Sequence, residues 1–343
     1  MRKLKNSLYL TDPDSWLTLS GEAIVIKGKE DQVVGRVPLL NLDEVISFGY
    51  RGMSPALMNA CMQRKIMVSF MSPTGKFLAR LQGGVQGNVF LREEQYLSFQ
   101  DNDFKMQIAK NCILGKLFNS RSVIERIRRD HQLSVDNEKL SEASGRLKIC
   151  IRKLIDVNQP EELRAVESEG ARVYYSVFNN LILGFEEFRF NGRSRRPPMD
   201  PVNAMLSFAY SLLAGLVTGG LESAGLDPYI GCLHVERSGR PAMSLDLMEE
   251  LRPILADRFV LSLINRKMVK GSDFITGEDG AVRMTDQFRK KFLSEWQNKK
   301  KEIITHPFLK EKVEWGIVPL VQSRLLAAHI RGDLPAYPPI FWK

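Results

Sequence analysis

The chain has 343 residues, a formal net charge of +9, and a composition that is 44% hydrophobic and 26% charged. This length exceeds what one hydrophobic core usually organises, so two domains are expected, and the composition excludes long disorder. The positive charge favours a polyanionic partner without identifying it. The four cysteines form no CxxC pair. That spacing argues against structural zinc and a disulfide framework, and it indicates a reducing, cytoplasmic compartment.

The first 88 residues are predicted to form a small β-sandwich-like domain. Short runs in which apolar and polar residues alternate are separated by turn residues, at 7–10, 16–19, 23–26, 33–37 and 66–71. One short helix is expected at 54–64, with Ser54 as its N-cap and Pro55 at its first helical position.

The remainder of the chain is predicted to be a larger all-α domain at 89–334, which makes the fold class α+β. Apolar residues recur there at intervals of three and four, and the domain boundary is expected between Gly83 and Glu94. The apolar segment 202–221 is long enough to span a membrane, but its polar residues favour a core helix. The proline-rich tail at 335–343 is expected to be an extended arm or a packed tail.

Basic residues concentrate in three segments of the predicted helical domain. A solvated helix face would explain any one of them, but three together favour a phosphate-binding surface. The members are Lys105, Lys110, Lys116, Arg121, Arg126, Arg128 and Arg129; Arg189, Arg193, Arg195 and Arg196; and Arg283, Arg289, Lys290, Lys291, Lys299, Lys300 and Lys301.

The first of three stretches suited to chemistry is a predicted helix on which Glu167, Gly170 and Tyr174 share one face. Glu169 points about 200° away from Glu167, so the two cannot bind one metal from the same helix. Gly170 weakens a helix by about 1 kcal/mol relative to Ala, which indicates a close approach to its backbone. An acid on a helix is, taken alone, more often a surface residue.

The second stretch, 225–234, ends at His234 in a loop rich in Gly and Pro, where a side chain can be aimed. By itself such a histidine is more often structural.

The third stretch is a predicted helix at 244–253. Ser244 is expected to be its N-cap, with Asp246 in the first turn. Asp246, Glu249 and Glu250 then form a carboxylate cluster on one face, and their mutual repulsion favours a cation nearby. Pro253 is expected to bend the helix because its ring clashes with the carbonyl of Glu249.

Together Glu167, His234 and Glu249 predict a metal site. Two carboxylates and one imidazole suit Mg²⁺ or Mn²⁺. Such a cation could polarise a phosphoryl oxygen and position an attacking water or DNA 3′-OH. The sequence contains no GxxxxGK[ST] loop, so no nucleoside triphosphate site is evident.

At these stretches the sequence resembles the CRISPR-associated integrase and endonuclease family (the Cas-one protein), which inserts new spacers into CRISPR arrays. The details look like the type I-C form, and the match covers the whole chain in order. The motifs are E-x-x-x-A-R-x-Y-Y at 167–175, R-P-P-x-D-P-x-N at 196–203, G-L-D-P-x-x-G-x-x-H at 225–234, D-L-M-E-x-x-R-P at 246–253 and Q-x-R at 322–324.

The resemblance implies Mg²⁺ or Mn²⁺ ligands at Glu167, His234 and Glu249. Asp246 would share the metal or support a ligand, and Tyr174 or Asp246 would orient substrate or water. Ser168 stands where many members have Gly, which leaves Glu169 as an alternative ligand, but the register of the following Ala-Arg-Val-Tyr-Tyr favours Glu167.

The resemblance also implies DNA as substrate and a homodimer formed through the β-rich domain. Two such dimers would flank a dimer of a small ferredoxin-like partner, and the complex would join 3′-OH ends of spacer DNA to the CRISPR repeat by transesterification. Two alternatives stay open. One is a hydrolytic nuclease with the same site, acting on branched or single-stranded DNA. The other is a non-catalytic DNA-binding assembly protein whose acids cap helices.

Overall fold

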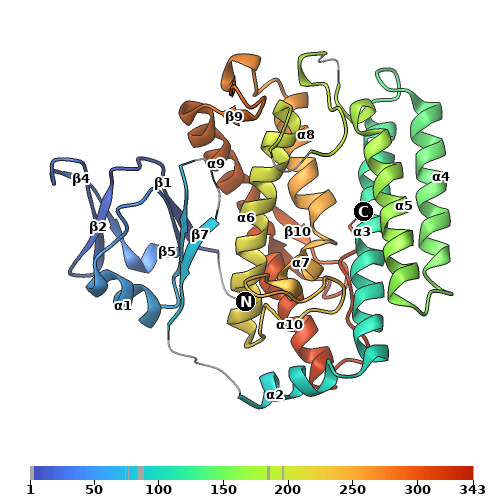
Figure 1. Ribbon diagram of the computed structural model, residues 1–343, viewed down its shortest axis with the longest axis horizontal. Coiled ribbons are helices and arrows are strands. Elements are labelled where there is room, and N and C mark those ends of the chain that lie inside the picture. Colours follow the sequence, from blue (N-terminus) through green and yellow to red (C-terminus); the bar gives the residue numbers. More distant parts are fainter. Residues whose placement is uncertain are drawn as a thin grey trace. The chain divides into compact units, whose positions relative to one another are not determined.

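The computed structural model describes residues 4–73, 75, 77–83, 89–183, 186–194 and 197–342. The chain divides into two compact units (Figure 1). The N-terminal unit comprises residues 1–87 and 284–302, and the helical unit comprises residues 88–283 and 303–343. A single boundary at 88/89 therefore does not separate the units, because residues 284–302 belong with the first.

The N-terminal unit is built on two sheets, as the alternating runs predict. In the four-stranded sheet, of order β1-β5-β6-β7, β5 pairs in parallel with β1 and β6, whereas β7 is antiparallel to β6. The three-stranded sheet is an antiparallel meander, β2-β3-β4. The strands are β1 (Asn6–Leu10), β2 (Trp16–Ser20), β3 (Ala23–Lys27), β4 (Val33–Pro38), β5 (Leu42–Phe48), β6 (Met67–Met71) and β7 (Phe77–Leu81).

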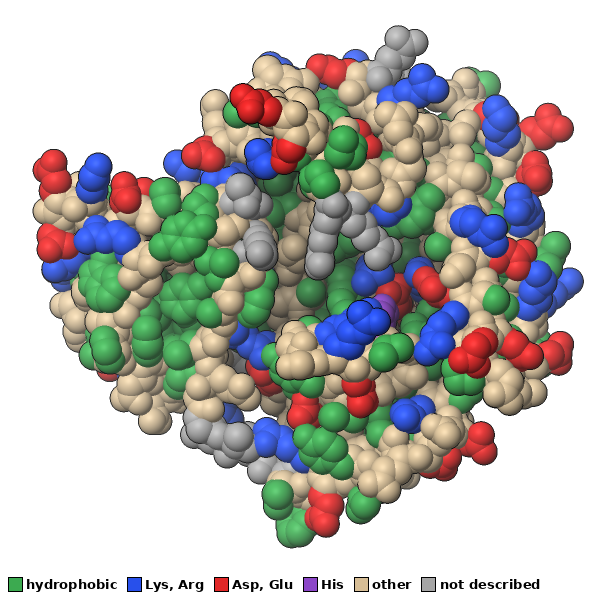
Figure 2. Space-filling view, in the orientation of Figure 1, with side chains coloured by type: hydrophobic (Ala, Val, Ile, Leu, Met, Phe, Trp, Pro, Cys, Tyr) green, Lys and Arg blue, Asp and Glu red, His purple; other side chains and the backbone are tan. Residues whose placement is uncertain are grey.

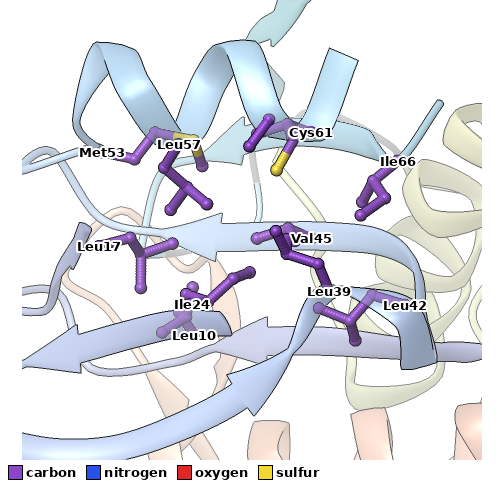
Figure 3. Close-up of a cluster of buried hydrophobic side chains, with 12 residues drawn as sticks. Leu10, Leu17, Ile24, Leu39, Leu42, Val45, Met53, Leu57, Cys61 and Ile66 are labelled. Carbon is purple, nitrogen blue, oxygen red and sulfur yellow. The ribbon is translucent and has the colours of Figure 1, made fainter. Parts of the chain in front are cut away.

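One hydrophobic cluster joins these sheets to helix α1 (Pro55–Gln63). Leu17 and Ile24 from the three-stranded sheet meet Val45 from β5 and Leu57 from α1, and all four are fully buried (Figure 3). Ser54 caps α1 by accepting a hydrogen bond from Leu57 N, which confirms the predicted cap and its proline at the first helical position.

Helix α9 (Asp286–Lys301) packs against β1 within the same unit. Lys300 is buried there, donates a hydrogen bond to Ser7 Oγ and lies 3.4 Å from Glu44 Oε2. Arg289 and Lys299 are also buried. These three residues are therefore not part of an exposed phosphate-binding surface, contrary to the prediction from charge. Arg195 and Arg196, from another of the basic segments, lie outside the described residues.

The helical unit contains two packed groups of helices. Helices α3, α4 and α5 contact one another, and α6 packs against α10, α7 and α8 (Figure 1). The helices are α2 (Val89–Ser98), α3 (Asn102–Asp130), α4 (Asn137–Lys153), α5 (Pro160–Ser176), α6 (Pro201–Ala224), α7 (Ala242–Met248), α8 (Arg258–Asn265) and α10 (Val318–Ile330), with 3₁₀ helices at Phe178–Leu181, Glu186–Phe188, Gly271–Asp273 and Trp315–Ile317; a further one, Leu39–Asn41, is in the N-terminal unit.

The periodicity predicted a purely helical domain in this part of the chain, and that prediction is wrong in one respect. Two short strand pairs interrupt it: β8 (Phe274–Thr276) with β9 (Val282–Met284), and the antiparallel pair of β10 (Ile303–Thr305) with β11 (Lys312–Glu314). Helix α6 is long and apolar enough to cross a membrane, but 72% of its most apolar window is buried by protein, which confirms the predicted core helix.

The proline-rich tail is packed rather than an extended arm. Tyr337 and Ile340 are fully buried. The Trp342 ring lies 5.1 Å from the Arg126 guanidinium and 4.4 Å from that of Arg258, within cation–π range. Lys343 and residues 84–88, where the predicted boundary falls, lie outside the described residues.

Candidate active site

The site is organised by a close contact between α3 and α5. A Cβ added to Gly170 on α5 would lie 2.2 Å from Leu117 Cδ2 on α3, so any larger residue would force the Leu117 side chain to move. The sequence predicted something close to Gly170, and that neighbour is α3. Because Lys116 precedes Leu117, the same contact brings its side chain beside Glu167, three residues before Gly170 on α5.

Lys116 lies between two of the predicted ligands. Its Nζ donates a short hydrogen bond to Glu167 Oε1 and lies 2.9 Å from Glu249 Oε2. Its side chain is only 12% exposed. Burial acts to lower the pKa of Lys116, but the carboxylates of Glu249 and Glu167 outweigh it and raise that pKa, so the ammonium stays charged.

Glu249 is buried and is surrounded by cations. Its Oε1 lies 2.6 Å from Arg252 Nη1, while Oε2 has no hydrogen bond of good geometry from the described residues despite its ion pair with Lys116. Burial acts to raise the pKa of Glu249, but Arg252 and Lys116 outweigh it and lower the pKa to about 2. The residue is therefore an ionised carboxylate with accepting capacity left.

Asp246 fixes the loop that carries His234. One carboxylate oxygen accepts from Cys232 N and Leu233 N, and the other from His234 N at 2.9 Å and His234 Nδ1 at 2.6 Å. Because Nδ1 donates to this carboxylate, the neutral tautomer of His234 has its lone pair on Nε2, the arrangement of metal-ligating histidines supported by a carboxylate. Nε2 lies 3.8 Å from Glu249 Oε1.

The local structure around Glu249 differs from the prediction in one respect. Helix α7 begins at Ala242 after Pro241, so Ser244 lies inside the helix and is not its N-cap, nor does Asp246 occupy the first turn. The α-helix ends at Met248, and a π-helical segment follows at Arg252–Asp257. This break at Pro253 confirms the predicted distortion, and π-helical turns are frequent at functional sites.

Of the predicted site residues, the structure brings Glu167, His234, Glu249 and Asp246 together, but not Tyr174. Tyr174 is buried in an aromatic cluster, with its ring centroid 5.8 Å from that of Phe178. Burial, with the charge of Asp257, raises the pKa of its hydroxyl well above the usual value. A buried neutral phenol is poorly placed to orient a substrate.

Glu169, the alternative ligand, points elsewhere. Its carboxylate pairs with Lys153 on α4 at 2.7 Å. The geometry thus favours Glu167. As the side chains stand, the described residues include no group of three or more His, Cys, Asp or Glu arranged to hold a metal ion, and Lys116 lies between the carboxylates of Glu167 and Glu249.

Two cations of the site, Lys116 and Arg252, were not singled out by sequence reasoning. Arg252 lies within the 246–253 motif, three residues after Glu249, so its place one helical turn away could have indicated the ion pair. Lys116 was counted only as one of many basic residues. Its apolar neighbours in Leu-Gly-Lys-Leu offer a weak signal of burial.

A cavity of about 420 Å³ adjoins the site in the helical unit. Leu163 and Leu233 contribute apolar walls, Lys105 and Arg164 contribute positive charge, and His234 lines the cavity as well. Its chemistry suits a ligand with one apolar and one anionic part.

Comparisons with known proteins identify the family of this chain. The family model described as CRISPR associated protein Cas1 matches residues 8–298. A CRISPR-associated endonuclease Cas1 of Rhodospirillum rubrum is 44% identical over 348 aligned positions, and one of Chlorobaculum tepidum is 42% identical over 344, each covering 100% of both chains.

Two solved structures share the fold. A casposase bound to its integration product has a TM-score of 0.85 and 23% identity, with 99% of this chain and 95% of that chain covered. A Cas1 protein from Thermotoga maritima has a TM-score of 0.80 and 22% identity, with coverages of 95% and 97%. The family-model match and the full-length relatives together place this chain in the CRISPR-associated Cas1 family.

Proposed function

We propose that this chain is a metal-dependent DNA integrase of CRISPR adaptation, which joins the 3′-OH ends of short spacer DNA to the CRISPR repeat by transesterification. The observation that carries the proposal is the meeting of Glu167 and Glu249, 82 positions apart, at the Lys116 ammonium, with His234 Nε2 3.8 Å from the other oxygen of Glu249. The names of the 42–44% identical relatives, CRISPR-associated endonucleases, support the same chemistry.

The residues present fit a divalent cation. Glu249 Oε2 is a buried acceptor whose 2.9 Å contact with Lys116 Nζ lacks good hydrogen-bond geometry, Glu167 Oε1 lies on the other side of that ammonium, and the neutral imidazole of His234 would offer Nε2. Two carboxylates and one imidazole suit Mg²⁺ or Mn²⁺. When bound, such a cation would polarise a phosphoryl oxygen and lower the barrier to attack on that phosphorus by a DNA 3′-OH, with the 3′-oxygen of the cut repeat strand as leaving group.

The chain's other residues would prepare the site for this cation. Asp246 holds the loop and the ring of His234 in place, and Arg252 keeps Glu249 ionised and oriented. The adjoining cavity would take the sugar and base beside the reacting phosphate, with Lys105 and Arg164 attracting the DNA backbone.

The proposal is tested with a donor duplex and a supercoiled plasmid that carries the repeat. We expect Glu167→Ala, His234→Ala and Glu249→Ala each to lower Mn²⁺-dependent joining at least about a hundredfold, because a catalytic metal contributes several kcal/mol to transition-state stabilisation. DNA affinity should stay nearly unchanged.

The matched control is Glu169→Ala, on the same helix but paired with Lys153, which should retain activity. Cleavage without joining would favour the hydrolytic nuclease. Full activity of all three alanine variants would contradict the site and leave a DNA-binding assembly protein as the better account.

A homodimer formed through the N-terminal unit is part of this proposal. β4 and β7 are edge strands of their sheets, and they expose Val34 and Phe77 at 65% and 55%. Hydrophobic side chains gather on the face of this unit in Figure 2. Exposed apolar edge strands of this kind are usually covered by a partner.

We expect Val34→Glu or Phe77→Glu to shift the mass in solution from a dimer toward a single 39.0 kDa chain, measured by light scattering. Leu133→Glu, at a fully exposed position of the helical unit, is the control and should leave the dimer intact. Unchanged mass in both edge variants would exclude these strands as the interface.

A higher complex with the small ferredoxin-like partner and with DNA is proposed on the likeness to known assemblies. One structural neighbour with a TM-score of 0.82 is described as a Cas6-RT-Cas1–Cas2 complex, and the casposase neighbour is bound to an integration product.

A further inference from the structure

Lys116 is placed where a cation bound by Glu167 and Glu249 would have to lie. Its Nζ contacts Oε1 of the first carboxylate and lies 2.9 Å from Oε2 of the second, and the side chain is 12% exposed. An ammonium and a divalent cation repel each other strongly at such short range away from bulk water. The two cannot share this position.

The backbone that carries Lys116 is closely packed on both sides. Leu117 is packed against Gly170, and a Cβ at Gly115 would lie 2.8 Å from Glu250 Cβ and 3.1 Å from Pro339 Cβ. Helix α3 is therefore in close contact on both sides of Lys116. Only the flexible side chain of the lysine can move, and the Glu167 side of the site, where that carboxylate is 26% exposed, is open to solvent.

We propose that Lys116 is a resident counter-cation of the site, and that a divalent metal binds by displacing its ammonium from between Glu167 and Glu249. The inference rests on the proposed metal site and adds a residue that no ligand motif contains. Lys116 is a positioning residue in this scheme: it keeps two carboxylates together when the metal is absent, and it weakens metal binding by the free energy of its own ion pairs.

The test compares Lys116→Met with the full-length wild type in Mn²⁺ titrations followed by the electron paramagnetic resonance signal of free Mn²⁺. Methionine keeps the length of the stem without the charge. We expect the variant to bind Mn²⁺ at least about tenfold more tightly than the wild type. The reason is that the contacts of the Lys116 ammonium with the carboxylates of Glu167 and Glu249 no longer compete with the metal. Without metal, the variant should unfold at a lower temperature, and Mn²⁺ should raise that temperature more than in the wild type.

Lys110→Met is the matched control on the same helix, because Lys110 donates only to the carbonyl oxygens of Ile155 and Val157 in the contacts described. It should leave Mn²⁺ affinity unchanged. Lys116→Arg retains the positive charge and should bind Mn²⁺ as weakly as the wild type, which separates the effect of the charge from that of changing the side chain. Lys116→Gln also removes the charge and should bind Mn²⁺ more tightly than the wild type, which keeps the test informative if the methionine variant does not fold.

Equal or weaker Mn²⁺ binding by Lys116→Met would overturn the inference. Its failure is distinguishable from failure of the proposed function. If Glu249→Ala still binds Mn²⁺ like the wild type, the metal site itself is wrong; if Glu249→Ala loses Mn²⁺ binding and Lys116→Met matches the wild type, only the role of Lys116 is wrong.

Discussion

Glu249 and Glu250 are neighbours in the sequence and both are buried, yet they lie in opposite environments. Glu249 faces Lys116 and Arg252, and its pKa is lowered to about 2. Glu250 accepts hydrogen bonds from the neutral groups Tyr337 OH, Gln322 Nε2 and Ile340 N. Burial outweighs these bonds and raises the pKa of Glu250 to about 7.

The difference arises from two adjacent faces of α3. Residues 115 and 119 share a face that meets Glu250 and the tail, whereas residue 116 is turned about 100° from 115 and meets Glu249. Lys116 and Arg252 keep the carboxylate of Glu249 ionised, so a metal ion could replace one of these cations. Neutral donors hold Glu250 as a structural anchor for the tail. Proximity to the site in sequence therefore does not decide which acid takes part in chemistry.

The largest effect is expected from removing the hydrogen bonds that hold the tail beside Glu250. Asn119 is fully buried, donates to Glu250 O at 2.7 Å and Ile340 O at 2.8 Å, and accepts from Trp342 N at 2.9 Å. Asn119→Leu leaves these groups buried without partners. We expect a loss of about 3 kcal/mol or more in the free energy of unfolding, measured by urea denaturation.

Asn111→Ala is the matched control, since Asn111 on the same helix makes one bond to the tail, to Tyr337 O, and is less buried. Its loss should be about 1 kcal/mol. If Asn119→Leu is no more destabilising than Asn111→Ala, the tail is not an integral part of this fold.

Much of the fold follows from local sequence signals. The alternating strands of the N-terminal unit, the Ser54 cap of α1 and the apolar helix α6 are each set by neighbouring residues. Strand β5 was not singled out because six of its seven residues are buried, so it lacks the alternation of a half-exposed strand. The return of α9 to the N-terminal unit depends on contacts 293 positions apart, such as Lys300 with Ser7, which periodicity does not report.

Only those residues of the candidate site that lie within the sequence motifs could be predicted. The clustering of Glu167, His234, Glu249 and Asp246 agrees with the resemblance. The different environments of Glu249 and Glu250 were not predictable from the sequence. They are set by Lys116 and Tyr337, which are remote from these acids in the sequence. Tyr174 shares a helical face with Glu167 in sequence, but seven residues are about two helical turns, or roughly 10 Å. That distance places it in the core instead.

The pH dependence of stability, measured in chelator-treated protein, distinguishes Glu249 from Glu250 by a smaller effect. The folded-state pKa of Glu250, about 7, is above its ordinary value of 4.5, so the stability that Glu250 contributes is fully present below pH 4.5 and is lost as pH rises toward 7. The folded-state pKa of Glu249, about 2, is below 4.5, so its contribution is present above 4.5 and is lost as pH falls toward 2.

We therefore expect Glu250→Gln to remove a decline in stability between pH 4.5 and 7, and Glu249→Gln to remove a decline below pH 4.5. Burial also raises the pKa of Asp257 to about 6, so each variant is read as a difference curve against the wild type, in which this shared contribution cancels. At pH 4.5, where Glu250 is largely protonated in the folded state, the net effect of Glu250→Gln is expected to be about 1 kcal/mol or less, since the amide can replace the neutral carboxyl group except for one acceptor oxygen. Identical difference curves for the two variants would mean that the neighbouring carboxylates share one environment, and the distinction between a cation-binding acid and an anchoring acid would fail.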